Sequence, residues 1–187
     1  STAASESTAS EDASGESQTT SGDGSTFTFI GGNPVTLNPI LSQSTDDGNT
    51  FYLLQSGLFR YYRDEVYNEI CDEYTVSDDG LVYNFHLREA NWSDGTPITA
   101  EQFAYSIQCA LNPEMGSPSA STYENVVGAM AYNSGEGSWD DVGVKVIDDQ
   151  NLEITLETPD DIFILTLATS GLYPLQQDFV EAQGEKL

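Results

Sequence analysis

The chain has 187 residues, of which 31 are Asp or Glu and only five are Lys or Arg, giving a formal net charge of −26. A surface this acidic repels phosphate backbones and anionic membranes, which excludes nucleic acid as a partner. No run of about 18 apolar residues is present, so no segment is predicted to span a membrane. The charge fits a solvated surface that keeps an exported protein soluble. The alternative is a site for calcium or a cationic substrate, although no carboxylate run has calcium-loop spacing.

The first 24 residues contain only Ser, Thr, Ala, Gly, Glu, Asp and one Gln. Because no large apolar side chain is available for burial, we predict a disordered linker over residues 1–25 and one domain over residues 26–187. Such a linker is typical of the segment after the lipid-bearing cysteine of a bacterial lipoprotein, which here would lie just before Ser1. The alternative is a flexible leader without a role.

Three elements are predicted in the first half of the domain. Thr26–Ile30 alternates polar and apolar side chains, which is typical of a strand. Apolar residues at helical spacing predict a helix over Asn49–Phe59. A second alternating run, Leu81–Leu87, predicts another strand, and Ser77–Gly80 before it has the composition of a hairpin turn.

The clearest predicted helix follows the turn Trp92–Pro97. Thr99 and Gln102 have the spacing of a capping box, and an apolar stripe at helical spacing follows. Its members are Phe103, Ile107, Ala110 and Leu111. Asn112-Pro113 predicts the end of this helix.

The last predicted elements are a hairpin and a short helix. Val144–Ile147 and Leu152–Leu156 are the two strands of the hairpin, and Asp160-Asp161 can cap a helix over Ile162–Ala168. The order of strands and helices predicts a mixed α/β or α+β fold without an internal repeat.

The sequence offers little support for catalysis or metal binding. The only histidine, His86, lies on the polar face of a predicted strand, and no nucleophile elbow or phosphate-binding loop is present. Cys71 and Cys109 do not form a CxxC pair, and metal sites need three or four clustered ligands. We therefore predict no enzyme activity, no cofactor and no metal. A Cys71–Cys109 disulfide is conceivable, but we predict that both thiols are reduced and that Cys71 is buried.

Tyrosines are abundant, and a tyrosine offers a binding cleft both a flat apolar face and a hydroxyl. The alternative is that most of them are half-buried packing residues. The tyrosines considered for a cleft are Tyr61, Tyr62, Tyr67, Tyr74, Tyr83, Tyr123, Tyr132 and Tyr173.

Three segments together resemble the solute-binding proteins of the oligopeptide/dipeptide ABC importers, known as family 5. The longest runs from Val82–Glu89 into Asn91–Ser106 and includes the Trp-Ser-Asp-Gly-Thr-Pro turn and the helix after it. The second is Gly143–Asp149 with Leu152–Leu156, and the third is Thr36–Pro39.

The resemblance covers roughly residues 26–187 and implies an incomplete first lobe of a two-lobed periplasmic-binding-protein-like fold, with a sub-lobe at about residues 56–169. It also implies an oligopeptide ligand, permease subunits as partners and a monomer. The expected location is extracellular or periplasmic, with membrane contact only through the lipid tether.

The resemblance further implies which main-chain segment contacts the ligand. In the family, an extended stretch shortly after the Asn-Pro pair hydrogen-bonds a peptide like an added strand. Here that stretch falls on Gln43, Ser44 and Thr45. The alternative is an ordinary exposed loop.

Side-chain positions depart from the family pattern. A ligand-facing tyrosine often follows the Ser-Pro pair, but Ser119 occupies that position here, with Tyr123 as a possible substitute. A cleft-facing histidine of the family aligns with Thr169. These departures bear on side-chain selectivity, whereas main-chain binding needs no particular side chain.

Other functions remain open at this point. The same fold family binds nickel chelates, haem, opines and oligosaccharides, so the ligand class is the weakest inference. A surface receptor or adhesin for signalling peptides is the second hypothesis. A hydrolase is the third, and the absence of a nucleophile–base pattern counts against it.

Overall fold

The computed structural model describes residues 31–170 and 172–183. The predicted linker over residues 1–25 and the predicted strand Thr26–Ile30 lie outside this range. The described elements, in chain order, are α1 (Thr45–Leu54), β1 (Phe59–Tyr62), β2 (Glu65–Asn68), β3 (Cys71–Val76), β4 (Val82–Leu87), α2 (Ala100–Leu111), the 3₁₀ helix η1 (Pro118–Tyr123), α3 (Ala129–Asn133), the 3₁₀ helix η2 (Trp139–Asp141), β5 (Val144–Asp148), β6 (Asn151–Thr155), α4 (Phe163–Ser170) and α5 (Gln177–Gln183).

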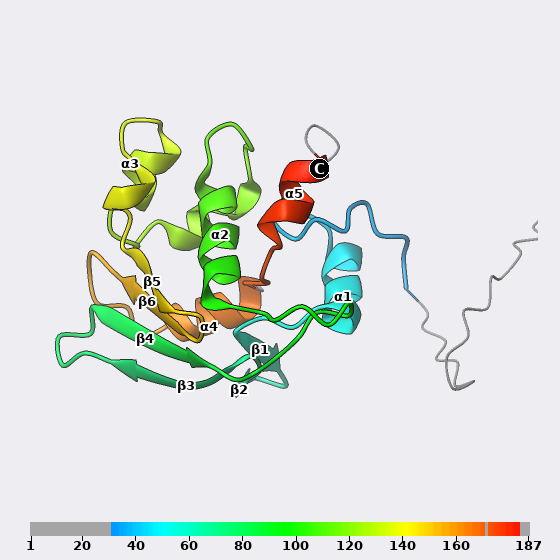
Figure 1. The fold of residues 1–187 in the computed structure, drawn as a ribbon, viewed down its shortest axis with the longest axis horizontal. Helices are drawn as coiled ribbons and strands as arrows, with labels where there is room; N and C mark the ends of the chain where they lie inside the picture. Colours follow the sequence, from blue (N-terminus) through cyan, green and yellow to red (C-terminus); the bar gives the residue numbers. More distant parts are fainter. Residues whose placement is uncertain (1–30, 171, 184–187) are drawn as a thin grey trace, which may run out of the picture. The chain divides into compact units, whose positions relative to one another are not determined.

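A four-stranded antiparallel sheet with the order β3-β4-β6-β5 forms the centre of the fold (Figure 1). The predicted strand Leu81–Leu87 and the predicted hairpin are both present, which confirms the mixed α+β class. On β4 the apolar side chains Tyr83, Phe85 and Leu87 are buried, whereas His86 is exposed on the opposite face. Gly80, at φ +73°, makes the sharp turn between β3 and β4 that a larger residue would strain.

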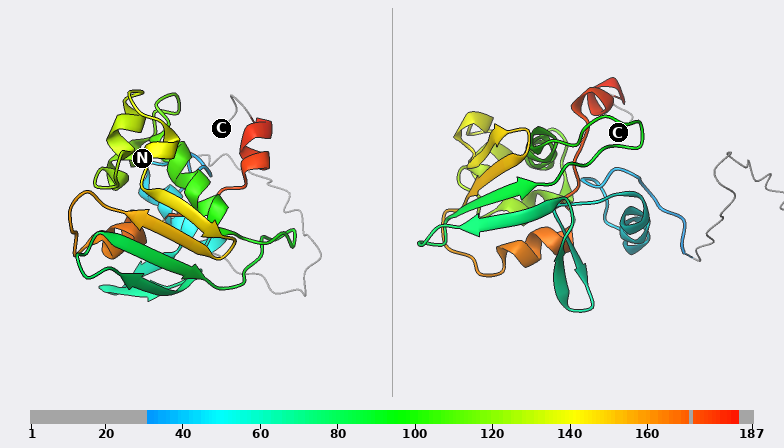
Figure 2. Two further views of the ribbon diagram at one scale, coloured as in Figure 1. Left: turned by 60° about the vertical axis from the view of Figure 1, so that its left-hand side comes forward. Right: turned by 60° about the horizontal axis from the view of Figure 1, so that its bottom comes forward.

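Helix α2 packs on one face of the sheet, as the two turned views show (Figure 2). Its predicted capping box, formed by Thr99 and Gln102, is present. The Trp92 Nε1–H donates to Gln102 Oε1 at 2.9 Å, so the turn before the helix is tied to the cap. All four residues of the predicted apolar stripe are fully buried, and this burial explains where the helix lies.

The helix predicted over Asn49–Phe59 is wrong at both ends. The structure places α1 earlier, from Thr45 to Leu54, and Phe59 starts strand β1. Gly48 resembles a helix breaker in the sequence, but Ser44 accepts a hydrogen bond from Asp46 N and starts the helix before it.

Strands β1 and β2 form a hairpin that projects from the rest of the described chain (Figure 2, right). Its turn uses Arg63 and Asp64, both at positive φ, where glycine or asparagine is usual. The sequence therefore carries no ordinary turn signal here. Phe59 anchors the hairpin by packing edge-to-face on Phe85, and Phe163 of α4 packs edge-to-face on Tyr83.

Both cysteines are free and buried, as predicted for Cys71. Burial raises the pKa of the Cys71 thiol to about 12 and also raises the pKa of Cys109. These thiols are therefore protonated packing residues at neutral pH. Among the described residues, no helix has the length and apolar character needed to cross a bilayer.

Candidate functional site

A small cavity brings together parts of the chain that are far apart in the sequence. It lies where the segment before α1, α1 itself, η1 and the end of α4 meet, and its volume is about 130 Å³. Its lining residues are Pro39, Ser42, Gly48, Phe51, Tyr52, Ser119, Thr169 and Tyr173. Two of the residues predicted for the ligand site, Ser119 and Thr169, therefore share one cavity.

Aromatic rings form one wall of this cavity. Phe51 and Tyr173 pack with ring centroids 5.8 Å apart and planes tilted by 60°. Burial raises the pKa of the Tyr173 hydroxyl to about 12, so this group stays neutral. Tyr52 is half exposed, and the guanidinium of Arg60 lies 5.0 Å from its ring centroid. The wall offers flat apolar surface to a ligand.

Hydrogen bonds hold the opposite wall in place. Ser117 is buried, donates its hydroxyl to the carbonyl oxygen of Ile40 and accepts from Ser119 N at 3.1 Å. Because Ile40 itself is buried in the core, this contact fixes both η1 and the segment before α1. Thr169 donates its hydroxyl to the carbonyl oxygen of Leu165 at 2.9 Å.

The segment predicted to pair with a ligand main chain is only partly extended. Ser44 has φ −112° and ψ 137°, which is extended backbone, but Thr45 is the first residue of α1. The prediction of an extended stretch is therefore wrong at Thr45, because the cap at Ser44 starts the helix there. Within the described residues, no hydrogen bond engages the main chain of Gln43, which is exposed.

Tyr123 does not lie at the cavity. Its side chain is only 4% exposed and packs in the hydrophobic core, so the suggestion that it replaces the family tyrosine is wrong. It ends the 3₁₀ helix η1, which packs against α2. Of the eight tyrosines considered for a cleft, Tyr173 alone lines this cavity.

Several residues of the site were not predicted from the sequence. Ser42, Phe51 and Tyr52 line the cavity, and Ser117 supports it. The Ser-Pro pair at Ser117 carries a signal for this role, since serine before proline is a common helix N-cap. Tyr52 carried no signal of its own, since its role depends on contacts between distant segments.

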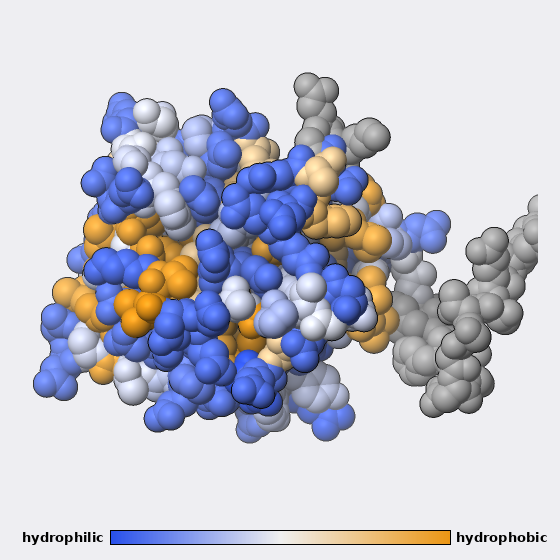
Figure 3. Space-filling model, in the orientation of Figure 1, coloured by the Kyte–Doolittle hydropathy of each residue, from blue (hydrophilic) through white to orange (hydrophobic). Residues whose placement is uncertain are grey.

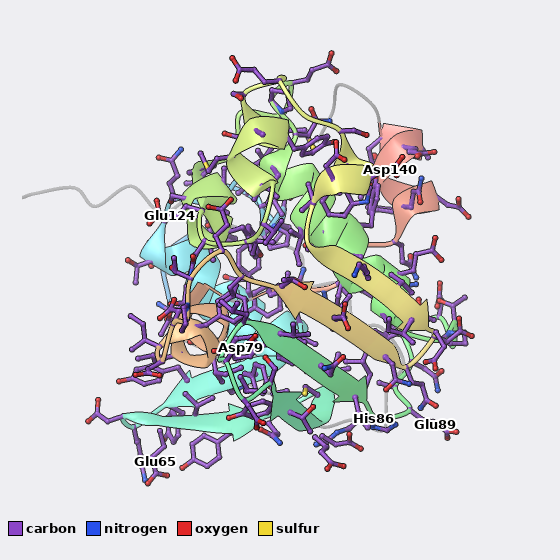
Figure 4. The ribbon with its side chains drawn as sticks, turned by 90° about the vertical axis from the view of Figure 1, so that its left-hand side faces the viewer. Glu65, Asp79, His86, Glu89, Glu124 and Asp140 are labelled. Atoms are coloured by element: carbon purple, nitrogen blue, oxygen red, sulfur yellow. The ribbon has the colours of Figure 1, made fainter. Side chains whose placement is uncertain are left out.

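None of the described residues that line this cavity is an Asp or Glu. Figure 4 shows labelled acidic residues such as Glu65, Asp79, Glu124 and Asp140 well separated on the surface. The described residues contain no group of three or more His, Cys, Asp or Glu side chains suited to a metal ion. Hydrophilic residues also dominate the face drawn in Figure 3, which fits a solvated acidic surface.

The model of the family described as bacterial extracellular solute-binding proteins, family 5 Middle, matches residues 65–186. The chain belongs to this family. It is 33% identical over 146 residues to the dipeptide-binding protein DppE of Bacillus subtilis, covering 77% of this chain and 27% of DppE. The resemblance seen in the sequence is thus confirmed at the level of the family.

Solved structures agree on the fold of the family 5 chain. The substrate-binding domain of an oligopeptide ABC transporter from Bacillus anthracis matches with a TM-score of 0.77 at 31% identity, covering 80% of this chain and 29% of that one. The pheromone receptor PrgZ matches with a TM-score of 0.79 at 28% identity, covering 84% and 32%. The chain therefore spans less than a third of the length of these proteins and corresponds to part of a two-lobed periplasmic-binding-protein fold.

Proposed function

We propose that the chain is part of the ligand-binding first lobe of an ABC importer's solute-binding component, and that it binds oligopeptides by main-chain pairing at Gln43 and Ser44. The observation that carries the proposal is the main chain of Gln43, which has no hydrogen-bond partner among the described residues. Gln43 directly follows Ser42, which lines the cavity that also holds Ser119 and Thr169. An extended peptide can satisfy its own main-chain groups on such a segment. Delivery to a permease, a lipid tether, an extracellular or periplasmic location and a monomeric state belong to the same proposal.

A receptor for signalling peptides is the second candidate. Its support is the likeness to PrgZ, which is described as a pheromone receptor with a known mode of peptide binding. Both candidates use the same peptide site, and they differ in whether a permease receives the ligand. No described feature of the cavity favours haem, a metal chelate or catalysis.

On this proposal the second lobe completes the peptide cleft, so the affinity of this chain alone is expected to be low. Exposed hydrogen bonds contribute little each, and ordering a flexible peptide offsets much of that gain. We expect a Kd no tighter than about 1 mM for trialanine. A polypeptide that adds the second lobe is expected to bind at least about 100-fold tighter, a difference of about 2.7 kcal/mol.

The test is a titration of the isotope-labelled 187-residue chain with trialanine, followed by NMR. Amide shifts are expected at Gln43, Ser44 and Ser119. Gln43→Pro removes a main-chain N–H and is expected to abolish these shifts, whereas Gln43→Ala keeps the main chain and is expected to bind like the parent. Equal binding by both variants would exclude main-chain pairing at Gln43. No binding by either the 187-residue chain or a polypeptide that adds the second lobe would point to a ligand other than a peptide.

A further inference from the structure

Asp47 is the one charged side chain that is buried in the part of the chain described by the structure. It belongs to the first turn of α1, and only 1% of its surface is exposed. Burying a carboxylate is costly unless donors replace the water it loses. The hydrogen bonds of the Asp47 carboxylate therefore indicate what role this buried charge has.

Three donors surround the Asp47 carboxylate. Val35 N and Thr36 N donate to Oδ1 at 2.6 and 3.3 Å, and the Ser42 hydroxyl donates to Oδ2 at 3.0 Å. The donors come from the two sides of Pro39, so one side chain clamps both ends of a segment with no regular secondary structure. Charge-assisted hydrogen bonds of this kind are the strong ones in proteins.

This clamp lies next to the proposed peptide-pairing segment. Ser42 lines the cavity and directly precedes Gln43 in the chain. Because the Ser42 hydroxyl hydrogen points to Asp47, its oxygen lone pairs remain free to accept a hydrogen bond. Thr169, across the same cavity, also donates its hydroxyl to the protein. Of the five described hydroxyl-bearing residues that line the cavity, Ser42 and Thr169 thus have hydroxyls whose hydrogen is used within the protein and whose oxygen can accept from a ligand.

We propose that Asp47 is a positioning residue that holds the segment from Val35 to Ser44 in its binding geometry and orients Ser42 to accept an N–H of the ligand. The inference rests on the proposed function, since it assigns a role at the same site. A segment held in place before binding loses less entropy when the peptide pairs with it. The ligand chemistry that fits is an amide or ammonium N–H.

The first measurement needs no ligand, so it is independent of the proposed function. Amide hydrogen exchange, read by NMR on the 187-residue chain, is expected to be at least about tenfold faster at Val35 and Thr36 in Asp47→Asn, because an amide group is a weaker acceptor than a carboxylate. Exchange at Ile107 in α2 is expected to stay unchanged. Asp46→Asn is the matched control, since it removes the same charge from the same helical turn. The Asp46 carboxylate lies beside Gly32, whereas the hydrogen bonds of Val35, Thr36 and Ser42 go to Asp47.

The second measurement is the affinity for trialanine at a temperature where every variant is fully folded. Asp47→Asn is expected to weaken binding at least about threefold, whereas Asp46→Asn leaves it unchanged. A purely structural role would lower the melting temperature without changing this affinity. Ser42→Ala keeps the Asp47 carboxylate and removes one of its donors, so it is the variant to use if Asp47→Asn does not fold. It is expected to weaken trialanine binding with little change in amide exchange at Val35.

The outcomes separate the two proposals. Unchanged exchange at Val35 and Thr36 in Asp47→Asn would overturn the positioning role, and so would faster exchange with unchanged trialanine affinity in both variants. If neither the 187-residue chain nor a polypeptide that adds the second lobe binds trialanine, the proposed function fails, while the exchange data still decide whether Asp47 holds the segment.

Discussion

Helix α2 and the segment leading into α1 are stabilised in opposite ways. Phe103 and Ile107 of α2 are fully buried against the sheet, so apolar surface removed from water holds this helix. The segment before α1 has one buried apolar anchor, Ile40, and otherwise depends on polar contacts through Asp47 and Ser117. The scaffold is therefore stabilised by non-directional burial of apolar surface, whereas the segment proposed to bind the ligand is stabilised by a few directional hydrogen bonds.

The largest expected change in the free energy of unfolding comes from removing a buried apolar side chain of α2. Phe103→Ala is expected to lower the free energy of unfolding by about 3–5 kcal/mol, because it leaves a cavity under α2. Glu101→Ala, at an exposed position of the same helix, is expected to change it by less than about 0.5 kcal/mol. Denaturant titration measures both values. A loss below about 1 kcal/mol in Phe103→Ala would mean that α2 does not depend on burial.

A smaller loss in the free energy of unfolding is expected when a polar contact of the segment before α1 is removed. Ser117→Ala removes the donor to the Ile40 carbonyl oxygen and the acceptor for Ser119 N, and is expected to cost about 1–3 kcal/mol. Ser121→Ala, exposed on the same 3₁₀ helix, is the control and should be near neutral. Trialanine affinity is expected to fall in Ser117→Ala more than in Phe103→Ala when both are measured below their melting temperatures. A larger loss of trialanine affinity in Phe103→Ala than in Ser117→Ala would contradict the view that polar contacts hold the proposed ligand-binding segment.

The smallest effect concerns the exposed face of the sheet. His86 Nδ1 lies 2.7 Å from Asp72 Oδ1, and this hydrogen bond raises the pKa of His86 and lowers that of Asp72. The raised histidine pKa means that its contribution to stability is lost as pH rises through that value. The lowered aspartate pKa means that its contribution is lost as pH falls through that value. The pair therefore stabilises the fold only between the two pKa values.

An NMR titration of the His86 ring checks this expectation. The pKa of His86 is expected above its ordinary value of 6.5 in the parent and closer to it in Asp72→Asn. Glu73→Gln, next to Asp72, is the control and should cause a smaller change, since Glu73 acts on His86 only as a minor contributor. Both side chains of the pair are exposed, so peptide affinity should not follow this titration.

How well the sequence predicts an element depends on whether a local pattern encodes it. The capping box at Thr99 and the stripe through Phe103 are local patterns, so α2 was placed within one residue. The β1–β2 hairpin was missed because Arg63 and Asp64 do not belong to the residues that usually form such a turn. A local sequence pattern thus predicts a helix or hairpin only where residues typical of its cap or turn are present.

The candidate site was predictable only through the resemblance. Ser119 and Thr169 do share a cavity, but no periodicity or spacing relates them. Asp47 looks like an ordinary acidic residue in the first turn of a helix, and its burial depends on Val35 and Ser42 folding back over it. Such contacts arise from the path of the chain, which a local sequence pattern does not contain.

The two buried thiols have a practical consequence for labelling. Cys71 and Cys109 are 0% and 5% exposed, and burial raises the pKa of both, so neither offers a reactive thiolate at neutral pH. A single cysteine introduced at the exposed position of Gln43 would therefore react selectively with a maleimide dye, without removal of the native cysteines. The chain is thus suited to conversion into an optical reporter whose fluorophore lies beside the cavity.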